Sequence, residues 1–233
     1  MKLDILVFGA HPDDIELGCA GTLIKEVQNN KKVGIIDLTR GELGTRGSAD
    51  TRDYETKKAT EIMGITIREN MNFRDGFFKD DEGHKLSLVR KIRQYQPEIV
   101  ITNAISDRHP DHPRSSQITV DACFLAGLEK IETNQPIWRP RAIYHYIQFN
   151  NIIPDIVVDI SEQMEQKLKA VKAYKSQFFD PDSVASETII SSEEFLKSVT
   201  YRAQDLGRQA SCKYAEGFLS HQLLKTDSLL EMT

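Results

Sequence analysis

The chain has 233 residues, of which 39% are hydrophobic and 28% charged, and its formal net charge is −5 at pH 7. This length suits one domain with a sizeable core, so we expect a single domain over residues 1–233. The acidic balance argues against a nucleic-acid partner, and no apolar run approaches the roughly 20 residues that span a bilayer. With no visible signal peptide and three widely spaced cysteines, we expect a cytoplasmic protein with reduced thiols.

Apolar and helical patterns alternate along the first two-thirds of the chain. Apolar runs predict strands at 5–8, 33–38 and 99–102, and a further strand that ends at 71–73. Helical spacing predicts helices at 15–27, 50–63, around 88–95 and at 116–127, the second capped by Asp50 or Thr51 and stopped by Gly64. This alternation predicts an α/β fold, a Rossmann-like three-layer sandwich with a mostly parallel central sheet.

The last third of the chain is predicted less regularly. We expect strands at 142–149 and 156–160, a charged helix from 161 to about 174, and a last helix at 192–206 with Gly207 as its C-cap. The polar segment 180–192 reads as a mobile loop, and we consider it as a lid over a substrate.

A histidine and two adjacent carboxylates follow the first strand, in the stretch Ala10-His11-Pro12-Asp13-Asp14. The plain interpretation is that Asp13 or Asp14 caps the next helix and that His11 is an ordinary loop residue. Adjacent carboxylates on a turn point in different directions, however, so one can bind a metal while its neighbour transfers a proton.

A second cluster, Asp107-Arg108-His109-Pro110-Asp111-His112, follows the strand expected at 99–102. Loops that follow parallel strands emerge at one edge of the sheet, so the two clusters should meet there. Two imidazoles with carboxylates suit zinc better than magnesium or calcium, and three protein ligands leave a position open for water. The alternative is a surface loop whose histidines touch only water. The two clusters together favour a catalytic metal site.

These motifs resemble the LmbE-like (PIG-L) family of zinc-dependent N-acetylglucosaminyl deacetylases. The resemblance covers nearly the whole chain and extends through residues 37–42, Arg74-Asp75-Gly76 and Tyr214-Ala215-Glu216-Gly217-Phe218. The length and the stretch Tyr174-Lys175-Ser176-Gln177-Phe178 are most similar to the deacetylase of bacillithiol biosynthesis, which removes acetate from N-acetylglucosaminyl malate.

The resemblance implies one Zn²⁺ per chain, with Fe²⁺ as the alternative metal in vivo, and assigns roles to particular residues. The metal ligands would be His11, Asp14 and His112. Asp13 would be the general base. His109 would stabilise the tetrahedral intermediate, and Asp111 would orient His109. Arg52 would bind an anionic group and Asp75 the sugar hydroxyls, with Glu42, Arg46 and, from a neighbouring subunit, Arg141 as further substrate contacts. The family analogy also implies a homo-oligomer, for example a hexamer, and a small amino-sugar substrate.

Other classes of function remain open at this point. Some substrate-binding candidates have alternative interpretations without a role in function. Arg52 could be a solvent-exposed charge at the start of a helix, and Glu42 and Arg46 could lie on a mobile, solvated loop. A dinucleotide-binding module is disfavoured because the first turn lacks G-x-G-x-x-G. A metal-dependent phosphoesterase would use two metals and more carboxylates. A deacetylase of another N-acetyl sugar or of chitooligosaccharides is a further alternative, which comparison of substrates would distinguish. Acetate release would exclude a non-catalytic, metal-stabilised sugar-binding protein.

Overall fold

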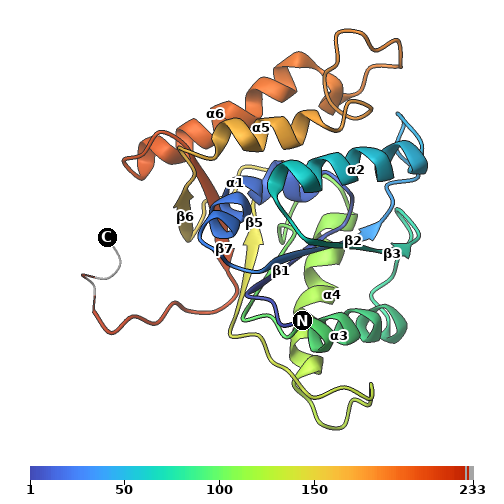
Figure 1. Ribbon diagram of the computed structural model, residues 1–233, viewed down its shortest axis with the longest axis vertical. Coiled ribbons are helices and arrows are strands. Elements are labelled where there is room, and N and C mark those ends of the chain that lie inside the picture. The colour runs from blue at the N-terminus through green and yellow to red at the C-terminus, as the bar shows by residue number, and fades with distance from the viewer. Residues whose placement is uncertain (229, 231–233) are drawn as a thin grey trace.

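In the computed structural model, seven strands form one sheet in the order β3-β2-β1-β4-β5-β7-β6 (Figure 1). The structure describes residues 1–228 and 230. Strands β1 to β5 run parallel to one another, and β7 is antiparallel to both of its neighbours, β5 and β6. The strands are β1 (Ile5–Gly9), β2 (Val33–Thr39), β3 (Ile67–Phe73), β4 (Ile99–Thr102), β5 (Ala142–Tyr146), β6 (Ile156–Asp159) and β7 (Ala215–Ser220).

Helices cover both faces of this sheet. One face carries α3 (Glu82–Tyr95) and α4 (Asp111–Ala126), and the other carries α1 (Asp14–Gln28) and α2 (Ala49–Met63). Outside α1 and α2 lies α5 (Met164–Lys172), while η1 (Ile189–Ser191) leads into α6 (Glu193–Gln209), which packs on β7. The predicted three-layer α/β sandwich with a mostly parallel sheet is confirmed.

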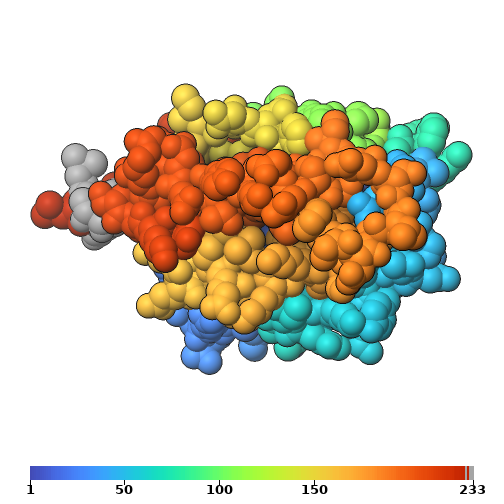
Figure 2. Space-filling model, turned by 90° about the horizontal axis from the view of Figure 1, so that it is seen from above, coloured from blue at the N-terminus to red at the C-terminus, as the bar shows by residue number. Residues whose placement is uncertain are grey.

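Side chains of β1 show why the sheet needs both helical layers. Val7 packs with the α1 side of the core, whereas Leu6 and Phe8 pack with α3 and α4. Successive side chains of a strand point to opposite faces, so a continuous apolar run must be covered twice. Seen from the α5 and α6 side, the chain from about 180 to 210 (orange) runs across this surface (Figure 2). No helix among residues 1–228 and 230 is long and apolar enough to cross a membrane.

The position of β1 in the sheet fixes where a ligand can bind. β1 lies between β2 and β4, so the connections from this strand and from β4 leave on opposite faces. In open α/β sheets the crevice at such a reversal, outside the carboxyl ends of the strands, is the usual ligand site. The segments that follow β1 and β4 are the two predicted clusters.

The start of α4 differs from the prediction. The helix expected at 116–127 starts five residues earlier than predicted, because α4 begins at Asp111 with Pro110 as its N-cap. Pro113 lies in the first turn of this helix, where a proline is tolerated because its missing N–H would have no intrahelical acceptor. His112 therefore stands on the first turn of a helix rather than on a flexible loop.

Other element boundaries were also mispredicted. Ser48, not Asp50 or Thr51, caps α2 by accepting a hydrogen bond from the Thr51 N–H at 3.1 Å. Gly64 ends α2 as predicted, with a φ of 72°. Gly207 lies inside α6 rather than capping it, and a Cβ there would stand 2.8 Å from the backbone of Lys213. The sequence reading missed β7, because glutamate and glycine are uncommon in strands.

Candidate active site

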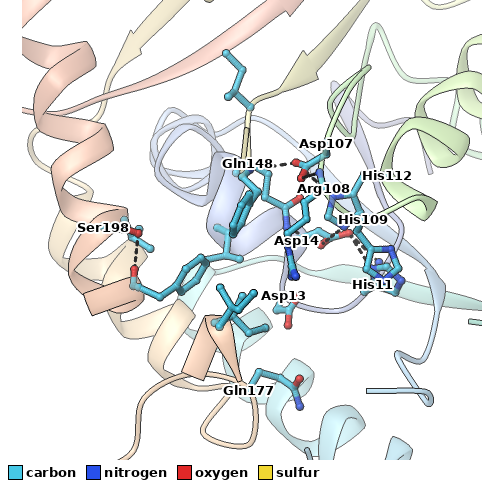
Figure 3. A pocket seen from close by; sticks show the side chains of 18 of the residues that line it. His11, Asp13, Asp14, Asp107, Arg108, His109, His112, Gln148, Gln177 and Ser198 are labelled. Atoms are coloured by element: carbon cyan, nitrogen blue, oxygen red, sulfur yellow. Dashed lines mark hydrogen bonds and ion pairs between the residues drawn. The ribbon is translucent and has the colours of Figure 1, made fainter. Parts of the chain in front are cut away.

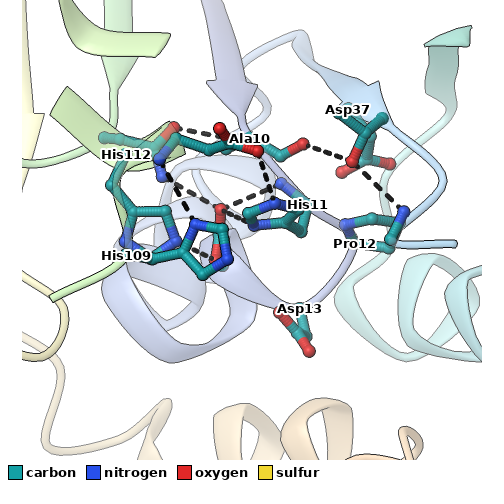
Figure 4. A network of polar contacts seen from close by, with 12 residues as sticks. Ala10, His11, Pro12, Asp13, Asp37, His109 and His112 are labelled. Atoms are coloured by element: carbon teal, nitrogen blue, oxygen red, sulfur yellow. Dashed lines mark hydrogen bonds and ion pairs between the residues drawn. The ribbon is translucent and has the colours of Figure 1, made fainter. Parts of the chain in front are cut away.

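The first cluster lies on a strained turn between β1 and α1. Asp13 is the N-cap of α1 and has a φ of 107°, a backbone conformation that residues other than glycine rarely adopt. Such a conformation costs about 1–3 kcal/mol and persists only where surrounding contacts hold it. The turn directs the two neighbouring carboxylates apart, since Asp14 lies among the histidines and Asp13 points away from them (Figures 3 and 4).

Two imidazoles converge on Asp14. His11 Nδ1 lies 3.5 Å from Asp14 Oδ2, and His112 Nε2 lies 3.2 Å from Asp14 Oδ1. Ligand atoms held tetrahedrally around zinc at 2.0–2.1 Å would be about 3.3–3.4 Å apart, close to both separations. Two imidazole nitrogens and a carboxylate are also a donor set that zinc accepts. The contacts of Asp14 with His11 and His112 therefore suit a divalent metal. Two other groups among the described residues bring their ligand atoms within 4.8 Å of one another; they are His11, His109 and His112, and His11, Asp75 and Asp111.

The second nitrogen of each imidazole faces another carboxylate. His11 Nε2 lies 3.1 Å from Asp75 Oδ1 and 3.3 Å from Asp111 Oδ2. His112 Nδ1 lies 3.4 Å from Asp107 Oδ2. Carboxylates in this position hold a metal-binding histidine in one ring orientation and increase its basicity. Asp75 and Asp111 thus support His11, and Asp107 supports His112.

Asp14 is itself fixed by two amide side chains. Asn103 Nδ2 donates to Asp14 Oδ2 at 3.0 Å, and Gln148 Nε2 donates to Asp14 Oδ1 at 2.7 Å. Burial alone would raise the pKa of Asp14, but the charges of His112 and His11 lower it well below its usual value. The same pairing, working against burial, raises the pKa of His112 to about 9. Asp14 is therefore a carboxylate, as a metal ligand must be.

Asp13 has different partners. Arg52 Nη1 donates to Asp13 Oδ2 at 2.8 Å, and Arg52 Nη2 donates to Gln177 Oε1 at 2.9 Å. Burial raises the pKa of Asp13 to about 7, although Arg52 acts to lower it. An acid with a pKa near 7 can both accept and return a proton at neutral pH. Asp13 and Gln177 engage both terminal nitrogens of the Arg52 guanidinium, while its Nε has no hydrogen-bond partner among the described residues, and the anion-binding role that the resemblance implies for Arg52 stays a prediction.

His109 faces the same centre from the loop after β4. Its ring lies 4.5 Å from the ring of His11 and 5.2 Å from that of His112, between centroids (Figure 4). The backbone N–H of Asp111 donates to His109 Nδ1 at 3.3 Å. Burial lowers the pKa of His109, and the neighbouring histidines lower it further. A neutral His109 whose Nδ1 accepts this bond carries its proton on Nε2.

The expected contact between the Asp111 carboxylate and His109 is not the one formed. That carboxylate accepts hydrogen bonds from the Gly76 N–H at 2.8 Å and from Arg114, in addition to its contact with His11. Asp111 reaches His109 through its backbone amide alone among the hydrogen bonds of residues 1–228 and 230. Asp111 therefore positions His109 through its backbone N–H and His11 through its carboxylate.

One cavity of about 670 Å³ joins these groups and extends to α6 (Figure 3). Of the predicted substrate contacts, Arg46, Arg52 and Asp75 line it. Glu42 is exposed and accepts a hydrogen bond from the Asp75 N–H at 2.8 Å, so it supports Asp75. Arg141 lies at the amino end of β5, at the opposite edge of the sheet, and its supply by a neighbouring subunit stays a prediction.

The segment expected to form a lid does border the cavity. Residues 188–190 line it, and Ser183 Oγ accepts a hydrogen bond from Arg46 Nη2 at 2.5 Å. Movement of this segment stays a prediction. The sequence reading did not single out Asn103, Asp107, Gln148 or Gln177 for roles at the site. Asp107 is close to the His109-Pro110-Asp111-His112 motif. An asparagine or glutamine far from the two histidine motifs in the sequence has no neighbouring residues that would indicate a role at the site.

A buried ion pair supports α1 where this helix is interrupted. Cys19, with a φ of −146°, breaks the helix. Lys167 Nζ donates to the Leu17 carbonyl at 2.8 Å, and the Glu216 carboxylate accepts from the Gly21 and Thr22 N–H groups at 2.9 and 2.7 Å. Lys167 and Glu216 also pair with each other at 2.5 Å. The pair thus satisfies backbone groups on both sides of the break.

Comparisons with known proteins identify the family of this chain. A family model described as PIG-L, GlcNAc-PI de-N-acetylase, matches residues 6–123. The chain is 29% identical over 225 residues to the diacetylchitobiose deacetylase of Thermococcus kodakarensis, covering 91% of this chain and 81% of that protein. It is 28% identical over 190 residues to a protein of Bacillus anthracis named "Probable N-acetyl-alpha-D-glucosaminyl L-malate deacetylase 2", covering 75% and 81%.

A solved structure shows the same fold at higher identity. The crystal structure of the conserved protein TT1542 from Thermus thermophilus matches with a TM-score of 0.88 and 34% sequence identity, over 97% of this chain and 98% of that one.

Proposed function

Because the chain belongs to the PIG-L family of de-N-acetylases, hydrolases that act on an N-acetyl amide, we propose that it removes the acetyl group from an N-acetylglucosamine conjugate. The substrate that we place first is N-acetylglucosaminyl malate, as in bacillithiol biosynthesis. The observation that carries the proposal is the division between two adjacent carboxylates. Asp14 meets the imidazoles of His11 and His112, whereas Asp13 meets Arg52 beside the same cavity.

His11, Asp14 and His112 would hold one Zn²⁺, which supplies Lewis-acid activation of the acetyl carbonyl and a lower pKa for water. Asp13 accepts the proton of the attacking water, because its carboxylate lines the cavity and its pKa is near 7. His109 donates a hydrogen bond from Nε2 to the oxyanion that forms. Asp13 then returns the proton to the leaving amine as the C–N bond breaks, which yields acetate and a free amino sugar.

A second substrate has comparable support. Similarity to the diacetylchitobiose deacetylase extends over more of this chain, 91%, than similarity to the malate deacetylase, 75%, at nearly equal identity. The stretch from Tyr174 to Phe178 favours the malate conjugate, and its Gln177 holds the arginine that contacts Asp13. A cytoplasmic location, a homo-oligomer and the use of zinc rather than Fe²⁺ stay predictions.

Acetate release from N-acetylglucosaminyl malate, N,N′-diacetylchitobiose and free N-acetylglucosamine tests the proposal directly. A kcat/KM at least about tenfold higher for the malate conjugate is expected. Equal or higher activity on diacetylchitobiose would transfer the assignment to that substrate. Metal analysis of the same preparation should give one zinc per chain, while two metals and no acetate release would favour a phosphoesterase.

A further inference from the structure

The cations that line the cavity differ in whether a carboxylate neutralises them. Arg52 pairs with Asp13 and Lys167 with Glu216, at 2.8 and 2.5 Å. The remaining three have no carboxylate oxygen within 4.0 Å among residues 1–228 and 230; they are Arg46, Arg108 and Arg202. These three guanidinium groups of the cavity wall therefore lack a directly contacting carboxylate in the described part of the chain.

Arg202 is the most informative of these three. Arg108 is exposed and lies over the ring of Phe149, where water also solvates its charge, and Arg46 donates to Ser183. Arg202 is half-buried on α6, and its single hydrogen bond in the described part of the chain goes from Nη2 to the Phe149 carbonyl at 3.2 Å. Burial lowers the pKa of Arg202, and the charge of Asp107 offsets this only in part.

The position of Arg202 relates it to the reaction centre. Phe149, whose carbonyl Arg202 contacts, donates its own N–H to Asp107 Oδ2 at 3.1 Å, and Asp107 faces His112. Ser198, one helical turn before Arg202 and so on the same face of α6, lies across the cavity from Asp14 and His11 (Figure 3). Arg202 therefore lines the same cavity as the histidines, and its guanidinium lies at the Phe149 carbonyl, two contacts away from His112.

We propose that Arg202 binds an acidic substituent of the substrate, a carboxylate or phosphate on the group attached to the amino sugar. A half-buried guanidinium without a partner carboxylate is unfavourable in the free protein and is satisfied when an anion enters. Its remaining N–H groups offer the paired donors that a carboxylate or phosphate accepts. The assignment rests on the proposed function and adds Arg202 to Arg52, which also contacts Asp13, as a residue for the acidic substituent.

Substrates that differ only in charge test this assignment. For Arg202→Gln, we expect kcat/KM to fall about 10- to 100-fold with N-acetylglucosaminyl malate, the range for losing a charge-assisted hydrogen bond, and to change less than about twofold with the neutral methyl glycoside of N-acetylglucosamine. N-acetylglucosamine 1-phosphate distinguishes a phosphate from a carboxylate as the preferred anion. Arg208→Gln is the matched control, since Arg208 is exposed on the same helix and pairs with Asp205.

A binding measurement separates failure of this assignment from failure of the proposed function. Titration of the zinc-loaded protein with L-malate and with inorganic phosphate should show saturable binding that Arg202→Gln weakens at least about tenfold and that Arg208→Gln leaves unchanged. Equal losses with charged and neutral substrates, or unaltered anion binding in Arg202→Gln, would overturn the assignment. Absence of acetate release from every sugar by the parent protein would instead refute the proposed function, whatever the titration shows.

Discussion

Gln177 offers a sharp test of how Asp13 is held. Its side chain accepts from Arg52 Nη2 at 2.9 Å and donates to the Arg46 carbonyl at 2.7 Å. In Gln177→Leu the buried guanidinium loses a neutral acceptor, a contact worth about 1.5–3 kcal/mol when one partner is charged. If the loss misplaces Asp13 and raises the activation free energy by the same amount, kcat decreases roughly 10- to 150-fold, since 1.36 kcal/mol corresponds to a tenfold change.

The expected signature is a lower kcat with little change in KM or metal content. Gln177 touches neither the histidines nor Asp14 among the contacts of the described residues, so zinc stoichiometry should stay at the parent value. Steady-state acetate release and metal analysis on one preparation measure both quantities. Gln163→Leu is the matched control, because Gln163 is equally buried just before α5 and bonds to Gln28 far from Asp13. Parent-like kcat in Gln177→Leu, or an equal loss in Gln163→Leu, would refute the reasoning.

Three further variants probe the metal, the base and the helix break. Asp13→Asn should retain zinc while kcat falls about 10²–10⁴-fold, as expected for losing a general base; activity near the parent value would remove Asp13 from that role. Asp107→Ala should weaken zinc affinity about 10- to 100-fold, because His112 loses its orienting carboxylate; competition with a chelator measures this, and unchanged affinity would contradict it. Glu216→Gln should lower the unfolding free energy by about 3–5 kcal/mol by leaving Lys167 unpaired in the interior, and urea denaturation showing less than about 1 kcal/mol would argue against an intact ion pair.

The residues of the reaction centre could be predicted from the sequence because they are grouped in two short motifs. His11, Asp13 and Asp14 follow one strand, and His109 and His112 follow another, so the rule that parallel strands end at one edge was enough to bring them together. The alternation of apolar and helical periods predicted the sheet and its two helical layers for the same reason.

What the sequence did not reveal depends on contacts between distant segments. Gln177 and Arg52 are 125 residues apart, and their hydrogen bond gives no signal in the sequence near either residue. The unbalanced charge of Arg202 appears only when every carboxylate near it has been located. The Asp111 carboxylate contacts His11 rather than His109, and Asp111 is the first residue of α4, five residues before the predicted start of that helix.

The ion pair at the break in α1 has a consequence for how the protein is made. Glu216, from the strand that is synthesised last, bonds to Gly21, which leaves the ribosome 195 residues earlier. The hydrogen bonds from Glu216 to the interrupted part of α1 therefore form only after nearly the whole polypeptide has been synthesised. Contacts between residues so far apart in sequence slow folding. Chains whose synthesis stops before β7 would expose an unclosed α1 and its apolar neighbours, so we expect them to be substrates for chaperones and proteases rather than partly active enzymes.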